Sequence, residues 1–216
     1  MLKPMYPQRK NAAALDPAPL LPVEHYFAGL NEVLRKVPFV EINRAVEVLL
    51  AAHREQRTIF LFGNGGSASL ASHLACDLNK GTISNKTHRL RVLALTDNVP
   101  LLTAWANDSC YEDIFAEQMR NFVRPGDVAF AISGSGNSPN VLKALGAARD
   151  AGAFTIVLTG YRGGRAAGLS DLAIIVPSED MQHIEDLHLT IAHSLFRSVR
   201  EAITLPQQRA SAAGLS

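Results

Sequence analysis

Short apolar runs that end in glycine, serine or threonine recur along this 216-residue chain, and they constrain its fold more than any other feature. Stretches with the apolar spacing of a helix lie between most of them, for example at 139–151. Alternating strands and helices indicate a parallel sheet covered by helices on both faces, with ligands bound at the carboxyl ends of the strands. The predicted strands are 58–62, 91–95, 127–132, 154–158 and 172–176.

The ends of the chain complete this single α/β unit. Apolar residues with helical spacing predict two helices before the first strand, at 23–36 and 41–54, and a closing helix at 181–202. No internal repeat or linker divides the chain. We therefore expect one domain over 21–204, with a flexible segment at 1–20 and a flexible tail at 205–216.

Composition excludes several classes of protein. A net charge of +1 offers no general attraction for nucleic acid, and no apolar run has the length of a membrane span. The N-terminus lacks the apolar core of a signal peptide. Cys76 and Cys110 have neither metal-binding nor redox spacing, so a reducing cytoplasm is expected. The low charged fraction, 19%, suggests that helix surfaces are buried between subunits.

A Ser/Gly segment at 133–138, Ser-Gly-Ser-Gly-Asn-Ser, follows the third predicted strand and precedes a helix. The first turn of a helix has unpaired N–H groups and a positive partial charge. Glycine lets the backbone approach an anion, and serine hydroxyls donate to phosphate oxygens. This segment therefore predicts a neutral phosphate-binding loop, although a Ser/Gly run alone is also common in ordinary turns.

A second glycine loop, Gly-Asn-Gly-Gly-Ser at 63–67, follows the first predicted strand. It lacks the Lys-Ser/Thr ending of a Walker loop and the spacing of a dinucleotide fingerprint. A tight turn with Ser67 as helix N-cap would also explain it. Since both loops end strands of one parallel sheet, they should meet at one edge and bind a small phosphorylated ligand.

The paired segments 62–68 and 132–138, together with Asn107-Asp108, the glycines at 160, 163 and 164 and the closing helix, resemble the phosphoheptose isomerases of the sugar isomerase (SIS) fold. The resemblance covers about 23–202. It implies a single-domain, three-layer, flavodoxin-like α/β fold with a five-stranded parallel sheet and additional N-terminal helices. It also implies a homotetramer whose active sites lie at subunit interfaces.

The same resemblance implies which residues hold a phosphorylated sugar. They belong to the two loops and to the Asn-Asp pair between them. They are Asn64, Gly65, Gly66, Ser67, Asn107, Asp108, Ser133, Gly134, Ser135 and Ser138.

Candidate acid–base residues lie on two predicted helices, the one after the first loop and the closing helix. His73 and Asp77, four residues apart, share one face of a helix, where a simple hydrogen bond would also explain them. His193 stands in an apolar stretch and would also suit a core histidine. Glu185 and His188 would also suit a solvated pair on the helix surface.

The resemblance places four of these residues at the zinc-ligand positions of phosphoheptose isomerases: His73, Asp77, Glu185 and His193. It also implies acid–base roles for Asp77 and His193. The usual residues at 77 and 185 are Glu and Gln, so this chain departs from the pattern twice. Because Asp77 is one methylene shorter than Glu, Glu185 remains an alternative base. Zn²⁺ is the expected metal, with another divalent ion as the alternative.

Glu185 and His193 are separated by eight residues, or about 12 Å along a straight helix. Zinc binds each ligand at about 2 Å. We therefore hypothesise that the helix bends or that a neighbouring subunit completes the site.

These features predict an aldose–ketose isomerase that uses enediol acid–base chemistry. The resemblance implies conversion of sedoheptulose 7-phosphate to D-glycero-D-manno-heptose 7-phosphate. The alternatives are a non-catalytic SIS tetramer that binds a replication initiator protein, and a sensor or an isomerase for a different sugar phosphate. No nucleic-acid or membrane partner is expected.

Overall fold

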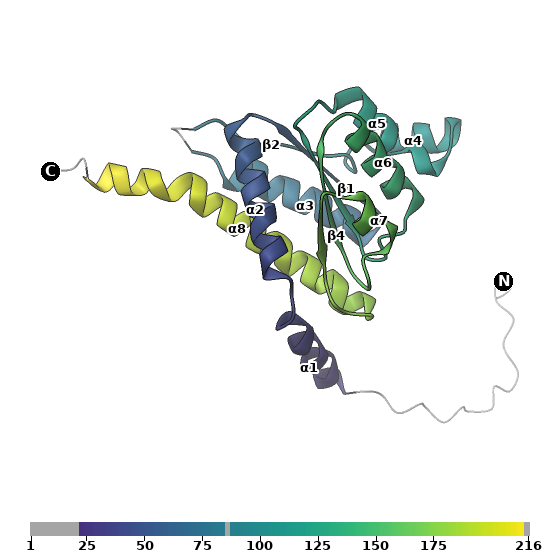
Figure 1. The fold of residues 1–216 in the computed structure, drawn as a ribbon, viewed down its shortest axis with the longest axis horizontal. Coiled ribbons are helices and arrows are strands. Elements are labelled where there is room, and N and C mark those ends of the chain that lie inside the picture. Colours follow the sequence, from purple (N-terminus) through teal and green to yellow (C-terminus); the bar gives the residue numbers. More distant parts are fainter. Residues whose placement is uncertain (1–21, 85–86, 214–216) are drawn as a thin grey trace, which may run out of the picture.

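The computed structural model describes residues 22–84 and 87–213, with side chains to 204, and within this part five strands form one parallel sheet (Figure 1). Their order is β2-β1-β3-β4-β5, which is the flavodoxin-like order. The predicted fold class is confirmed. The strands are β1 (Thr58–Gly63), β2 (Arg91–Ala94), β3 (Val128–Ser133), β4 (Phe154–Thr159) and β5 (Leu172–Ile175).

Side chains of successive strand residues alternate between two apolar layers because a β-strand has a period of two. Ile59 and Leu61 of β1 pack in one core cluster, whereas Phe60 and Phe62 pack in the other. The first layer holds α2 (Phe39–Arg54), α3 (Gly66–Gly81) and α8 (Met181–Ala213). The second holds α4 (Val99–Asp108), the 3₁₀ turn η1 (Tyr111–Asp113), α5 (Ala116–Phe122), α6 (Pro139–Asp150) and α7 (Gly164–Leu169).

Helix α1 (Val23–Leu34) has no buried residue in this chain and extends away from the sheet (Figure 1). It is attached to α8 by two hydrogen bonds. The Tyr26 hydroxyl donates to Asp186 at 2.5 Å, and the His183 ring meets the Tyr26 backbone carbonyl at 3.1 Å. The bond to Asp186 raises the pKa of Tyr26 to about 12. Leu30 and Val33 at the end of α1 are half-buried against the core, whereas Val23 and Phe27 at its start stay exposed.

The closing helix is longer than predicted, because α8 continues to Ala213. The predicted tail at 205–216 therefore overlaps this helix, while the segment 1–20 and residues 214–216 lie outside the described residues. Helices α1 and α2 confirm the two predicted N-terminal helices to within two residues at each end. No described helix is both long and apolar enough to cross a lipid bilayer.

Strand β1 lies between β2 and β3, so the strand order reverses beside it. The loop at 63–67 follows β1, and the loop at 133–138 follows β3. Gly63 pairs with Ile132 in the register of these strands, which brings the two loops side by side. Ligands of open α/β sheets bind at such a reversal point. The fold therefore brings the two predicted loops to one edge.

Candidate functional site

In the loop at 133–138, here called the serine loop, two serine hydroxyl oxygens accept hydrogen bonds from the backbone of the loop itself. The Gly136 backbone N–H donates to Ser133 Oγ, and the Asn137 N–H donates to Ser135 Oγ, both at 3.2 Å. A serine oxygen that accepts one of these bonds still has its own proton to donate. Ser133 is buried, whereas Ser135 and Ser138 are half-buried beside it. The loop can therefore donate several hydrogen bonds to one anion.

The glycine loop after β4 (residues 160–163) and the following helix α7 hold the serine loop in place. The N–H groups of Gly160 and Ala166 donate to the carbonyls of Gly134 and Gly136, both at 2.9 Å. The backbone at Gly136 has φ +63°, and a Cβ there would overlap the Gly163 carbonyl oxygen. Glycine is therefore required on grounds of both conformation and space. The serine loop is shaped before any ligand arrives.

The first glycine loop turns sharply into α3. Gly65 has φ +55° and is the N-cap, so the alternative of Ser67 as the cap is wrong. The Asn64 and Asn140 side-chain amides donate to each other's carbonyl oxygens, at 2.9 and 2.8 Å. Sequence reasoning missed Asn140. Its place directly after Ser138-Pro139, at the start of α6, was the available signal, and its role is to join the two loops.

The predicted substrate residues Asn107 and Asp108 belong to the helix layer that also contains α6, the helix that follows the serine loop. They are exposed at the end of α4, in the opposite helix layer from α3 and α8, and the Asn107 amide donates to Asp108 at 2.8 Å. Among the described residues, no hydrogen bond or ion pair connects them to either loop. Tyr111 reaches the first loop instead, and its hydroxyl donates to Asn64 at 3.3 Å.

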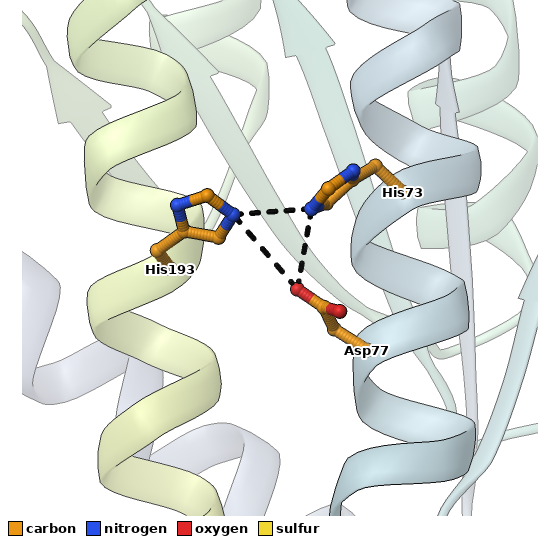
Figure 2. A group of neighbouring side chains, drawn as sticks. All are labelled: His73, Asp77 and His193. Atoms are coloured by element: carbon orange, nitrogen blue, oxygen red, sulfur yellow. Dashed lines mark hydrogen bonds and ion pairs between the residues drawn. The ribbon is translucent and has the colours of Figure 1, made fainter.

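His73, Asp77 and His193 meet between α3 and α8, and we call them the histidine cluster (Figure 2). His73 Nε2 lies 3.0 Å from His193 Nε2 and 3.4 Å from Asp77 Oδ2, which is 4.0 Å from His193 Nε2. Helical spacing places the first two on one face of α3. His193 comes from a helix 120 residues further along the chain. The alternative of a buried core histidine is wrong for His193, because its side chain is 51% exposed.

The donor atoms of the cluster fit a divalent metal ion. Two ligands at about 2.05 Å from a tetrahedral zinc ion are separated by about 3.3 Å. The three observed separations, 3.0, 3.4 and 4.0 Å, bracket this value. Two imidazole nitrogens and a carboxylate oxygen form a donor set that zinc commonly accepts, with one position left for substrate or water.

Glu185, the fourth predicted ligand, is not a member of the cluster. Its carboxylate lies against Gly66 at the start of α3, where a Cβ would be 3.5 Å from Oε1. The positive end of α3 stabilises a carboxylate at this place. Glu185 lines a cavity of about 260 Å³ together with Gly66, Ser67 and His73. The structure thus brings three of the four predicted ligands together and leaves Glu185 as a separate carboxylate nearby.

His188 lines the same cavity, and the alternative of a solvated Glu185–His188 pair is wrong. Glu185 is exposed, but His188 is only 1% exposed. Burial lowers the pKa of His188 to about 4, and a hydrogen bond to the Thr159 backbone carbonyl opposes this shift only in part. The signal was present in the sequence, because position 188 shares the buried helix face of Ile184 and Ile191.

The chain is similar to known proteins in sequence and in fold. The family model for the SIS domain matches residues 25–160. The phosphoheptose isomerase of Aquifex aeolicus is 40% identical over 173 residues, which cover 78% of this chain and 90% of that protein. The phosphoheptose isomerase of Paramagnetospirillum magneticum is 44% identical over 171 residues, covering 78% and 85%. The structure of phosphoheptose isomerase GmhA from Neisseria gonorrhoeae superposes with a TM-score of 0.77 at 31% identity, covering 82% and 96%.

Proposed function

This chain belongs to the phosphoheptose isomerases of the SIS domain family, and we propose that it interconverts sedoheptulose 7-phosphate and D-glycero-D-manno-heptose 7-phosphate. The observation that carries the proposal is the position of His73. This residue belongs to the histidine cluster and also lines the cavity that begins at Gly66 in the first loop. A phosphorylated sugar anchored in the serine loop can therefore extend toward an imidazole–carboxylate group.

We assign metal binding to the histidine cluster. His73 Nε2, His193 Nε2 and Asp77 Oδ2 would hold a divalent ion, with zinc as the best match to the donors. When bound, the ion would supply a Lewis acid that polarises the substrate carbonyl. A nitrogen that binds a metal cannot carry a proton at the same time. We therefore assign His193 to the metal, and its predicted role as a proton donor applies only to the metal-free cluster.

Glu185 is our choice for the base. It is a carboxylate outside the cluster that shares a cavity with His73, so it can accept a proton without losing a metal bond. The carboxylate would take a proton from C1 of the ketose while O2 gains one from water, which gives the enediol; it would then return its proton to C2 while O1 loses one to water, which gives the aldose. One carboxylate on one side of the sugar can perform both transfers. The serine-loop hydroxyls meanwhile hold the phosphate still.

We also propose that the site is completed in a homotetramer. The side chains of His73 and His193 are 50% and 51% exposed in the single chain, which leaves the reacting atoms open to water. Helix α1 exposes Val23 and Phe27 and has no buried residue of its own. Asn107 and Asp108 are exposed at the end of α4, so we propose that they contribute to substrate binding at a subunit interface. We also propose a cytoplasmic location.

The reaction can be tested in D₂O with sedoheptulose 7-phosphate as the substrate, followed by proton NMR. We expect deuterium incorporation and formation of the aldose, loss of both after chelation, and recovery with Zn²⁺. A zinc-loaded protein that produces neither exchange nor aldose would contradict the proposal. Such a protein would favour a non-catalytic role, or a sensor or isomerase for another sugar phosphate.

Two matched substitutions distinguish the proposed role of the Glu185 carboxylate as base from that of the Asp77 carboxylate as metal ligand. Glu185→Gln should lower kcat by about 100-fold with the bound metal retained, because Gln keeps the shape but cannot accept the proton. Asp77→Asn should lower both the metal content and kcat, because it removes a ligand. Metal analysis and initial rates on the same samples give the comparison. Full activity in Glu185→Gln would mean that Glu185 is not the base and would favour Asp77 in that role.

A further inference from the structure

Asp186 is a carboxylate residue in the wall of the 260 Å³ cavity for which the proposed reaction gives no role. It stands seven residues before His193 on α8, which places both residues on one face of the helix, two turns apart. Asp186 is exposed, so a ligand in the cavity can reach it. It therefore lies on the same side of α8 as the histidine cluster, nearer to the start of the helix.

Tyr26 of α1 orients this carboxylate. The Tyr26 hydroxyl donates to Asp186 Oδ2 at 2.5 Å. Because the pKa of Tyr26 is about 12, the hydroxyl keeps its proton at neutral pH and remains a donor. Asp186 Oδ1 accepts no hydrogen bond from the described residues. A carboxylate can accept several hydrogen bonds, so Asp186 is an oriented acceptor with capacity for a ligand.

The bond to Asp186 is not the only attachment of α1 to α8. The His183 ring meets the Tyr26 backbone carbonyl at 3.1 Å, and the centroids of the two rings are 4.7 Å apart. A Cβ on Gly29 would come within 2.7 Å of His183 Cε1, so α1 lies closely against this ring. A phenylalanine at position 26 would keep these contacts. The Tyr26 hydroxyl therefore adds the orientation of Asp186 to an attachment that exists without it.

The other residues of the cavity wall indicate the chemistry of the ligand. Glu185 is a second carboxylate residue there, and no lysine or arginine of the described chain lines this cavity. Two carboxylates without a basic partner repel a phosphate group, but they accept hydrogen bonds from hydroxyl groups. They do not form a second metal site, because among the described side chains the histidine cluster is the only group of three or more potential ligands close enough to share an ion. The phosphate is thus directed to the serine loop and the hydroxylated carbon chain to Asp186.

We propose that Asp186 accepts hydrogen bonds from hydroxyl groups of the sugar chain, oriented for this by Tyr26, and so selects polyhydroxylated substrates over other phosphate esters. This inference rests on the proposed function and adds to it a residue that distinguishes the carbon chain from the phosphate. Asp186 contacts the substrate itself and is a specificity residue. Tyr26 acts through Asp186 and is a positioning residue, which makes α1 part of the active site.

Asp186→Asn tests the acceptor, because it removes the charge and keeps the size of the side chain. Calorimetric titration with sedoheptulose 7-phosphate should show about tenfold weaker binding for this variant. Pentyl phosphate, which has the phosphate and no hydroxyl groups on its carbon chain, should bind it as it binds wild-type protein. Glu179→Gln is the matched control, because it removes an exposed negative charge just before α8 at a residue that does not line the cavity. It should bind both ligands with wild-type affinity.

Tyr26→Phe tests the positioning role, because it removes only the hydroxyl. This variant should bind sedoheptulose 7-phosphate about threefold more weakly and pentyl phosphate normally. The double variant with Asp186→Asn should bind the sugar phosphate no more weakly than Asp186→Asn alone, since the hydroxyl acts through the carboxylate. Losses that add in the double variant would overturn the positioning role of Tyr26.

Wild-type affinity for the sugar phosphate in Asp186→Asn would overturn the inference, and so would an equal loss for both ligands, which indicates a purely structural residue. A second measurement uses sugar phosphates that lack one hydroxyl at a time. One of them should bind wild-type protein about tenfold more weakly than sedoheptulose 7-phosphate does, and should bind Asp186→Asn equally well. If none does, the inference fails. Failure of wild-type protein to exchange deuterium in D₂O would separately remove the proposed function.

Discussion

The serine loop and the histidine cluster are built in different ways, although in the proposed reaction one substrate contacts both. Backbone hydrogen bonds from the glycine loop after β4 hold the serine loop, which follows a central strand. The histidine cluster consists of half-exposed side chains from two helices, α3 and α8. The first site therefore depends on the conformation of a short segment, and the second on how two distant helices pack. Substitutions at the two sites should accordingly affect different properties.

Gly136→Ala should have the largest effect, because it alters the frame of the serine loop. Alanine is strained at φ +63°, and its Cβ would overlap the Gly163 carbonyl. We expect the free energy of unfolding to fall by about 4 kcal/mol, from the left-handed backbone and the overpacking together. Urea denaturation gives the value. Gly146→Ala, where a Cβ meets nothing within 4 Å, is the matched control and should cost little.

Acidification should weaken the fold next most strongly, through His188. Below its ordinary pKa of 6.5 the unfolded histidine binds a proton, but the buried ring binds one only near pH 4. The unfolded state therefore gains protons first, and stability falls by about 3 kcal/mol between pH 6.5 and 4. His188→Asn should lack this contribution. Urea denaturation at several pH values gives the free energy of unfolding of both proteins. An equal loss of stability with acidification in wild type and His188→Asn would show that burial does not lower the pKa of His188.

His193→Asn should leave stability nearly unchanged and remove function, in contrast to Gly136→Ala. Its side chain is 51% exposed, so little packing is lost. We expect kcat to fall by at least about 100-fold, with loss of bound metal. Steady-state rates, metal analysis and a thermal melt distinguish the two effects. A near-normal rate would remove His193 from the active site.

Ser135→Ala should produce the smallest change, confined to phosphate binding. One proposed donor to the anion is lost together with the acceptor of the Asn137 N–H, while the bonds from Gly160 and Ala166 that hold the loop remain. We expect about tenfold weaker binding of both sugar phosphate and pentyl phosphate. A loss for the sugar phosphate alone would show that Ser135 contacts the carbon chain and not the phosphate.

The sequence predicts the serine loop well because its determinants are local. The strand, the glycines and the start of α6 stand within a few residues of one another, and their order specifies the geometry. The bonds from Gly160 and Ala166 come from the segment after β4 and from α7, yet the glycines at 160, 163 and 164 were already part of the resemblance. For this region, the sequence-based prediction and the structure agree closely.

The histidine cluster is predicted less completely because it depends on packing between distant helices. His73 and Asp77 follow from helical spacing, but the approach of His193 is decided by how α8 lies on α3. The eight-residue separation of Glu185 and His193 made a shared ion difficult, and Glu185 lies outside the cluster. Asn140 and His188 were missed or misread because their significance comes from buried partners. Burial depends on the tertiary packing of α6 and α8.

Helix α3 also has a consequence for the length of substrate. It begins at Gly66 beside the phosphate-binding edge and carries His73 seven residues later, a rise of about 10 Å. A helix of this kind is stiff, so it fixes the distance between the loop edge of the sheet, where the proposed base Glu185 lies against Gly66, and the histidine cluster proposed to bind the metal. One turn more or fewer, about 5.4 Å, would position the reacting carbons of a longer or a shorter sugar.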